Sequence, residues 1–303
     1  MPNLAPHPWR MFLPLAIVLF LAAIWSGYWF IASGIAQDRL AAAREKLTAE
    51  GLTLSCVKEA WGGYPFHFEF SCSSPVVSQA GQIQLRSANI LLVALAYAPW
   101  QVAALVDGPT VLSGQGQKET KITHQRALAA VTFDKAWQPS LSAEIPAVSY
   151  GTLGKAGKLM LFTRPSATGG NDIAIETSGV TYTPADKPPI SVDAGSLQGT
   201  LQTDNSFKID RIEFQQGPLR YWGSGMLALD VQHRIAGQID TETNDIQKLL
   251  DIAGPQLGLS DGKLANLRTV LGLLGNDAKI PIIARDGVLY LGPFQAAELK
   301  PLY

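Results

Sequence analysis

The 303-residue chain has few of the residues from which catalytic and metal sites are built. It contains two cysteines and four histidines, and neither the nucleophile motif GxSxG nor the zinc motif HExxH occurs. Charged residues make up 16% of the chain and the net charge is -1, whereas soluble domains typically have about 25% charged residues. This composition excludes a polybasic nucleic-acid-binding protein.

The histidines are not spaced as metal ligands. None of His7, His67, His124 and His233 shows an i, i+4 or CxxC-type relation to a second ligand. The glycine-rich stretch GTLGKAG (151–157) lacks the GK[ST] ending of a phosphate-binding loop and leads into no helical pattern, which favours an ordinary loop. We expect a non-enzymatic protein without a metal or cofactor site, although one sequence leaves a dispersed catalytic triad open.

An uncharged stretch, residues 12–34, lies near the N-terminus. A hydrocarbon core of about 30 Å requires about 20 apolar residues in a helix, so this stretch predicts a transmembrane anchor. Trp25, Tyr28 and Trp29 lie in its last third, where aromatic rings favour the membrane interface. A signal peptide cleaved near residues 34–36 is the alternative, but the apolar region of such signals is usually only about 7–15 residues long.

The orientation of the anchor depends on three observations. Only Arg10 and the N-terminal amine precede it, and the charged residues that follow are Asp38, Arg39, Arg44, Glu45 and Lys46, so basic residues do not favour a cytoplasmic N-terminus. A short leader before an apolar helix nevertheless usually stays in the cytosol, and a cysteine pair is best used in an oxidising compartment. We expect residues 1–11 to be a cytoplasmic leader, the anchor to lie in the inner membrane and the main domain to be periplasmic.

The rest of the chain predicts a short helix and then a sheet. Residues 35–50 continue the anchor as a juxtamembrane helix that ends at Gly51. Residues 51–303 form the exported β-rich domain, in which Gly, Pro, Asn and Asp separate alternating apolar runs at 83–93, 103–106, 143–150, 158–162, 171–177 and 189–195. Short turns between strands require antiparallel pairing. The expected fold is mainly β, a long curved antiparallel sheet or half-barrel.

Three local features stand near the C-terminus. The opposite parity of Ile209 and Ile212 predicts a bulge near residues 210–211, and Asp286-Gly287 predicts a hairpin turn. Two short helices lie between these features. We expect the first to be capped by Asn244 and stopped at Gly254-Pro255, and the second to follow Ser260 with a leucine stripe that ends at Gly275.

The two cysteines flank a turn in the sequence AWGGYPFHFEFSC, residues 60–72. The turn motif comprises Gly62, Gly63, Tyr64, Pro65 and Phe66. If the numbers of paired residues sum to 128, Cys56 faces Cys72, and Phe68 and Phe70 share their face. This arrangement predicts a disulfide; two free buried thiols, or a metal or redox site, are the alternatives.

The same register places His67, Glu69 and Glu59 together on the outer face of the hairpin. These residue types could form an acid-base cluster, but no nucleophile or oxyanion feature accompanies them. A polar face exposed to solvent is therefore the favoured interpretation.

The order of anchor, cysteine-flanked GYPF core (63–66), the segment GPLRYWGSGMLALD (217–230) and DGVLYLGP (286–293) resembles a known family. It is similar to the membrane-anchored proteins of Gram-negative bacteria grouped as domain of unknown function 2125, in which arginine more often follows GYPF than the histidine found here. The resemblance implies no particular activity. The strand-rich, singly anchored plan is also similar in outline to AsmA-like proteins, whose long curved sheets are implicated in moving phospholipid.

Two functions of different classes follow. The first is lipid binding or transport in envelope maintenance, through an apolar groove on a curved sheet whose missing cover is supplied by acyl chains. The second is a periplasmic scaffold that binds another envelope protein, with the inner face of the sheet closed by its own late helices. The expected partners are therefore membrane lipid and a possible envelope protein.

Overall fold

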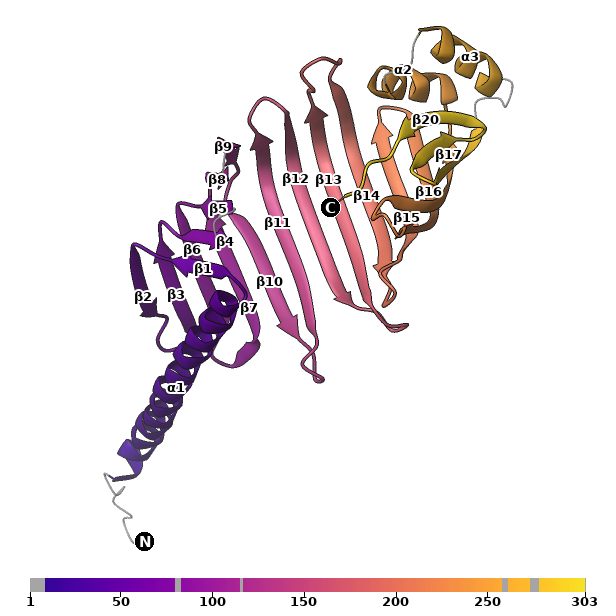
Figure 1. Ribbon diagram of the computed structural model, residues 1–303. Helices are drawn as coiled ribbons and strands as arrows, with labels where there is room; N and C mark the ends of the chain where they lie inside the picture. The colour runs from indigo at the N-terminus through magenta and orange to yellow at the C-terminus, as the bar shows by residue number, and fades with distance from the viewer. Residues whose placement is uncertain (1–8, 80–82, 115–116, 258–260, 273–277, 303) are drawn as a thin grey trace, which may run out of the picture.

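The computed structural model describes residues 9–79, 83–114, 117–257, 261–272 and 278–302. One antiparallel sheet extends from helix α1 (Trp9–Ala49) to two short helices, α2 (Ile246–Leu257) and α3 (Asp261–Gly272) (Figure 1). The mainly β fold with an N-terminal apolar helix and two late helices is as the sequence predicts.

The strands nearest α1 are short. They are β1 (Leu52–Ser55), β2 (Lys58–Gly62), β3 (His67–Ser73), β4 (Val76–Gln79), β5 (Ile83–Arg86), β6 (Asn89–Leu95), β7 (Ala98–Asp107), β8 (Thr110–Gly114), β9 (Gln117–Thr123) and β10 (Ala127–Phe133). Most of them are halves of longer strands, broken at about the same level of the sheet. Hydrogen bonds such as Ser74 N to Ala88 O and Ala88 N to Asp107 O join the breaks of neighbouring strands, so the sheet stays continuous there.

The second half of the chain is a regular meander. Its strands are β11 (Pro139–Tyr150), β12 (Gly154–Pro165), β13 (Asn171–Tyr182), β14 (Ile190–Leu201), β15 (Phe207–Gln216), β16 (Leu219–Leu229), β17 (Ile235–Thr243), β18 (Ala278–Arg285), β19 (Val288–Leu291) and β20 (Phe294–Glu298). Each pairs antiparallel with the next. Helices α2 and α3 occupy the connection between β17 and β18, so they lie at the C-terminal end of the sheet (Figure 1).

Helix α1 is continuous through both predicted segments, with no break between residues 34 and 35. It ends at Ala49, and Gly51, two residues later, has a φ of +85°, the left-handed conformation favoured by glycine after a helix. One stretch, Phe12–Ala49, is long and apolar enough to cross a membrane, and it is the only such helix in the described part of the chain.

The predicted bulge and hairpin are both present. The register between β15 and β16 shifts between Ile209 and Ile212, which keeps both side chains on the same face. Strands β18 and β19 pair around Asp286 and Gly287, both of which have positive φ as a type I′ turn requires. Strand β20 adds a further antiparallel neighbour that the sequence pattern did not predict.

Two predictions about α2 were wrong. Its first turn is capped by Asp245, whose Oδ1 accepts a hydrogen bond from Lys248 N at 3.0 Å, while Asn244 Oδ1 accepts one from Arg220 N. The helix also continues through Gly254-Pro255. A Cβ at residue 254 would lie 2.7 Å from Leu264 Cδ1, so this glycine permits close packing of α3. Ser260 and the predicted end of α3 near residue 275 lie outside the described residues.

The GYPF motif forms the turn between β2 and β3. Gly63 has a φ of +98°, and its carbonyl accepts hydrogen bonds from both Phe66 N and His67 N. A Cβ at this position would lie 2.4 Å from His67 O, closer than two such atoms can approach. Glycine is therefore required by the backbone here, whereas Gly62 has open space around it.

Replacing Gly63 with alanine should destabilise the β2–β3 hairpin by about 1–3 kcal/mol. The alanine backbone would have to keep a strained positive φ, and its Cβ would displace His67. Denaturant unfolding of the full chain in detergent, followed by circular dichroism, measures the change. Gly62→Ala is the matched control and should unfold close to the wild type. Equal stabilities of the two variants would contradict this account of the turn.

Candidate functional site

Helix α1 is fixed to the sheet by three aromatic hydrogen-bond donors. Trp25 Nε1 donates to Pro65 O at 2.8 Å, Tyr28 Oη to Ala96 O at 2.6 Å, and Trp29 Nε1 to His67 O at 3.0 Å. The acceptors belong to the β2–β3 and β6–β7 turns, which lie side by side because Ala96 N donates to Phe66 O. The helix thus satisfies carbonyl groups that irregular backbone would otherwise leave without a protein partner.

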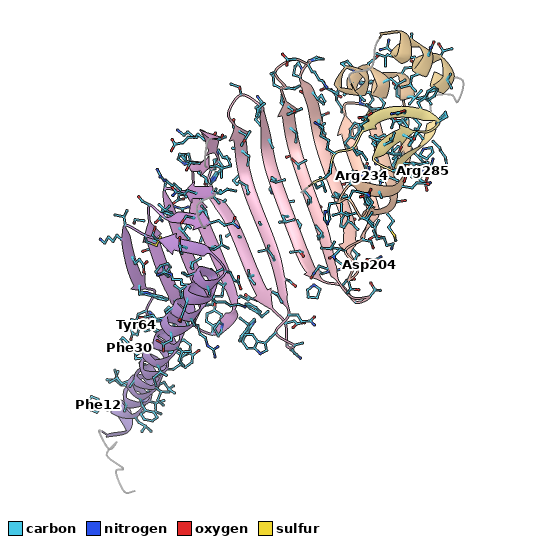
Figure 2. All side chains as sticks on the ribbon, in the orientation of Figure 1. Phe12, Phe30, Tyr64, Asp204, Arg234 and Arg285 are labelled. Carbon is cyan, nitrogen blue, oxygen red and sulfur yellow. A yellow bond between two sulfur atoms is a disulfide. The ribbon has the colours of Figure 1, made fainter. Side chains whose placement is uncertain are left out.

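Aromatic packing reinforces this attachment. The indole of Trp29 is buried, with its ring centroid 5.8 Å from that of Phe68 and 5.3 Å from that of Tyr64. Tyr64 also stacks on Phe30, and the two lie beside each other along α1 in Figure 2. Further along the helix, the Arg44 guanidinium lies 5.0 Å from the centre of the Phe70 ring. The contacts therefore extend along much of the second half of α1.

The predicted disulfide joins Cys56 to Cys72, with the two Cα atoms 5.4 Å apart. The predicted register was wrong, however. Cys72 faces Glu59, and Cys56 lies at the corner between β1 and β2. The residues of β2 are all exposed, so no alternation of buried side chains fixes how this strand pairs.

The corrected register separates the proposed acid-base cluster. Glu59 lies on the same face as Cys72 and forms an ion pair of 3.0 Å with Arg44 of α1. His67 and Glu69 lie on the opposite face, with 3.3 Å between His67 Nε2 and Glu69 Oε2. A catalytic assembly of the three residues is therefore not formed.

Two rows of directly opposed residues cross the sheet on one side, which we call the apolar face. The first contains Phe70, Leu92, Ala104, Ala129, Ala143, Leu161, Ile175, Leu197, Ile212, Gly223, Thr241 and Ile280. The second contains Phe68, Ala94, Val102, Val131, Leu141, Thr163, Ile173, Gly199, Ile209, Gly225, Ile239, Ile282 and Leu291. Opposed residues of antiparallel strands share a face. Threonine is the only polar residue type in either row.

The apolar face is covered only at its two ends. Phe68 and Phe70 are buried beneath α1, and Ile280 is buried beneath α2 and α3. Among the described residues from Pro99 to Gln198, none is buried. A sheet with an apolar face normally buries it against a second layer of structure, which the middle of this sheet lacks.

The other face of the sheet is charged across the same strands. Lys158 pairs with Glu144, Arg164 with Asp172, and Lys279 with Glu242. A hollow of about 570 Å³ on this side is lined by polar groups such as Ser142 and Gln198 together with a few apolar ones. The charged face is therefore suited to contact water, and the apolar face is not.

Glu213 on the charged face is paired with two arginines. Hydrogen bonds from Arg220 and then from Arg211, whose Nη2 lies 2.6 Å from Glu213 Oε2, lower the pKa of Glu213 below its ordinary value, although partial burial opposes the shift. Both arginines flank one carboxylate across the β15–β16 pair. This group therefore helps to hold the bulged strands together.

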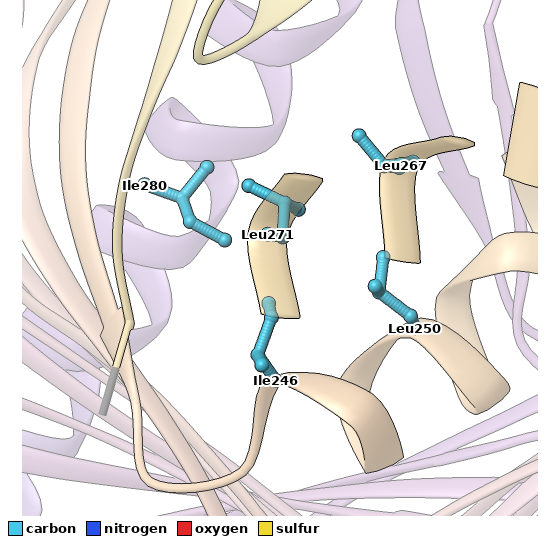
Figure 3. Close-up of a cluster of buried hydrophobic side chains, with 5 residues drawn as sticks. All are labelled: Ile246, Leu250, Leu267, Leu271 and Ile280. Atoms are coloured by element: carbon cyan, nitrogen blue, oxygen red, sulfur yellow. The ribbon is translucent and has the colours of Figure 1, made fainter. Parts of the chain in front are cut away.

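At the C-terminal end, the apolar face forms the wall of a cavity of about 450 Å³. The cavity lies between the rolled sheet and α2, and it is lined by residues that include Phe214, Tyr221, Leu249, Leu267, Ile280 and Leu289. Figure 3 shows Ile280 of β18 facing side chains of the two helices. Burial raises the pKa of the Tyr221 phenol further above neutral pH, so Tyr221 adds no charge to this wall. The volume and apolar lining are typical of a small-molecule site.

A chain of side-chain hydrogen bonds, which the sequence patterns did not reveal, runs along the strand breaks of the first half of the sheet. Ser87 Oγ lies 2.9 Å from Thr110 Oγ1, which lies 2.9 Å from His124 Nε2, and His124 Nδ1 lies 2.6 Å from Gln125 O. These residues come from three separate strand breaks. Their hydrogen bonds connect the breaks. No group of three His, Cys, Asp or Glu side chains in the described ranges is placed to hold a metal ion.

The architecture defines a protein with one helix suited to anchor it in a membrane and a long, half-covered β-sheet. The family model described as "Uncharacterized protein conserved in bacteria (DUF2125)" matches residues 29–300, so the chain belongs to that family. A search of curated proteins and a search of solved structures each found no match.

Replacing both cysteines with serine should lower the free energy of unfolding by about 3 kcal/mol, the value expected for closing a loop of this length. Urea unfolding of the oxidised wild type, the reduced wild type and the double variant measures the loss. The last two should unfold at the same lower urea concentration. A reduced protein as stable as the oxidised one would contradict a stabilising role for the disulfide.

Glu213 should make stability depend on pH. Because its pKa in the folded protein lies below the unfolded value of about 4.3, its contribution is complete above that value and is lost as the pH falls through the folded pKa. Glu213→Gln should therefore destabilise the protein at neutral pH and differ less from the wild type in acid. Glu176→Gln, on the same face without an arginine pair among the described residues, is the control. A pH-independent difference for Glu213→Gln would contradict the prediction.

Proposed function

We propose that the chain is an inner-membrane protein whose periplasmic sheet binds lipid, with acyl chains lying along the apolar face. The observation that carries the proposal is the unbroken pair of apolar rows, which begin under the membrane helix, stay uncovered across the central strands and end at an apolar cavity. An exposed apolar surface of this extent marks an interaction site.

An extended lipid suits this surface better than a compact ligand. The rows are long and narrow, and their side chains offer no hydrogen-bonding group other than the threonine hydroxyls. Acyl chains would supply the missing second layer and gain free energy from the removal of apolar surface from water. Headgroups would remain at the rim, where water can solvate them.

The proposed periplasmic location is supported by the disulfide. Disulfides form and persist in oxidising compartments such as the bacterial periplasm, and both cysteines of the chain are paired. This requirement supports an N-terminus in the cytosol and a sheet outside it, because one helix suited to cross a membrane separates the two.

The scaffold alternative has less support. It requires the late helices to close the inner face of the sheet, but the contacts of α2 and α3 among the described residues reach no further back than the β13–β14 connection. The partly exposed positions of β11 to β13 are left available for a ligand.

Photo-crosslinking in intact bacterial cells tests the proposal. A benzophenone amino acid at Leu161, on the apolar face, should form phospholipid adducts that mass spectrometry detects on the labelled peptide. The same group at Met160 points to the charged face and should give few phospholipid adducts. Equal lipid labelling at both positions would argue against a lipid-binding face. Protein adducts alone at Leu161 would favour the scaffold.

A further inference from the structure

The position at which the sheet is attached to α1 has a consequence for its depth in the membrane. Residues 12–24 of the helix are exposed, and the first contact with the sheet is at Trp25. At 1.5 Å per residue, these thirteen residues span about 20 Å. A hydrocarbon core is about 30 Å thick, so about 10 Å of it must lie beside later residues of the helix.

The later residues are suited to lipid. Phe30, Ile31 and Ile35 are 65%, 69% and 54% exposed, although the Phe30 ring also stacks on Tyr64, and the first charged residue after Arg10 is Asp38. Figure 2 shows Phe12 near the free end of α1 and Phe30 beside Tyr64 of the sheet. The turns that contact residues 25–29 therefore lie at the same level as membrane-facing helix.

The two turns have the composition of a membrane interface. Tyr64 and Phe66 of the β2–β3 turn and Tyr97 and Trp100 of the β6–β7 hairpin are 54%, 62%, 63% and 46% exposed. Residues 90–106 contain no charged side chain, so β6 and all of β7 except its last residue, Asp107, are uncharged on both faces. Aromatic rings of this kind favour the boundary between acyl chains and headgroups.

The backbone of the turns is also adapted to low polarity. Carbonyl groups of Gly63, Pro65, Phe66, His67 and Ala96 all accept hydrogen bonds from within the protein. Irregular backbone in contact with lipid requires such partners because no water is present to supply them. A turn held in bulk water would not need three donors from the anchor helix.

From these observations we propose that the tips of the β2–β3 and β6–β7 hairpins are embedded in the leaflet on the sheet's side of the membrane that holds α1. The β10–β11 turn, which carries Asp134 and Lys135, stays outside. The partner is the lipid of the anchoring bilayer. The embedding follows from helix length and turn chemistry, and it does not depend on lipid binding by the central sheet.

Fluorescence quenching of the full chain in phosphatidylcholine and phosphatidylglycerol vesicles tests the depth of the tips. The only native cysteines form the disulfide, so a bimane label reacts only with an introduced thiol. Label at Tyr97→Cys should show a blue-shifted emission and lose intensity when the lipids carry bromine near the headgroup. Label at Leu19→Cys, in the exposed helix, lies deeper, and its quenching by bromine placed along the acyl chains confirms insertion.

Leu153→Cys, at the exposed β11–β12 turn on the opposite edge of the sheet, is the control and should keep its intensity. Phe66→Cys provides a second tip position if the Tyr97 variant does not fold. A tip label that behaves like the Leu153 label, while the Leu19 label is quenched, would overturn the proposal.

Discussion

An apolar sheet face must be covered, and this chain supplies a cover only at the two ends. The rows that begin at Phe68 and Phe70 and end beyond Ile280 require a second layer along their whole length. Helix α1 provides it over the first strands, and α2 with α3 provides it over the last. The charged opposite face, with pairs such as Glu144–Lys158, shows that the sheet is not simply apolar throughout. The proposed function follows from this difference between the faces.

The attachment of α1 gives the uncovered face a fixed position. The indole and phenol donors of Trp25, Tyr28 and Trp29 hold the turns of two hairpins. The ion pair between Arg44 and Glu59 and the disulfide at Cys72 secure the strands behind these turns. The helix therefore serves as the first wall of the sheet, and the apolar rows start beside a helix that is long and apolar enough to cross a membrane.

The sequence predicted what depends on local chemistry. Asp286-Gly287 predicted its hairpin because few residue pairs accept two positive φ angles, and the parity of Ile209 and Ile212 required a bulge. The disulfide was predictable because the chain has one cysteine pair. The register of β2 could not be predicted, because all of its side chains are exposed and favour neither face of the sheet. The sequence also did not predict the docking of α1, because its aromatic side chains bond to backbone carbonyl groups, which carry no sequence signal. It did not predict the hydrogen bonds between Ser87, Thr110 and His124, because these residues lie far apart in the chain.

The number of strands in the meander sets the length of the apolar face. From β3 to β18 the first apolar row crosses twelve strands, and at about 4.8 Å between neighbours this corresponds to roughly 50 Å along the sheet. Each long strand contacts mainly the one before and the one after it. Like a repeat protein, such a sheet can gain or lose a hairpin in its middle while both ends keep their own packing. The distance between the α1 end of the sheet and the C-terminal cavity is thus set by the number of hairpins, in steps of about 10 Å.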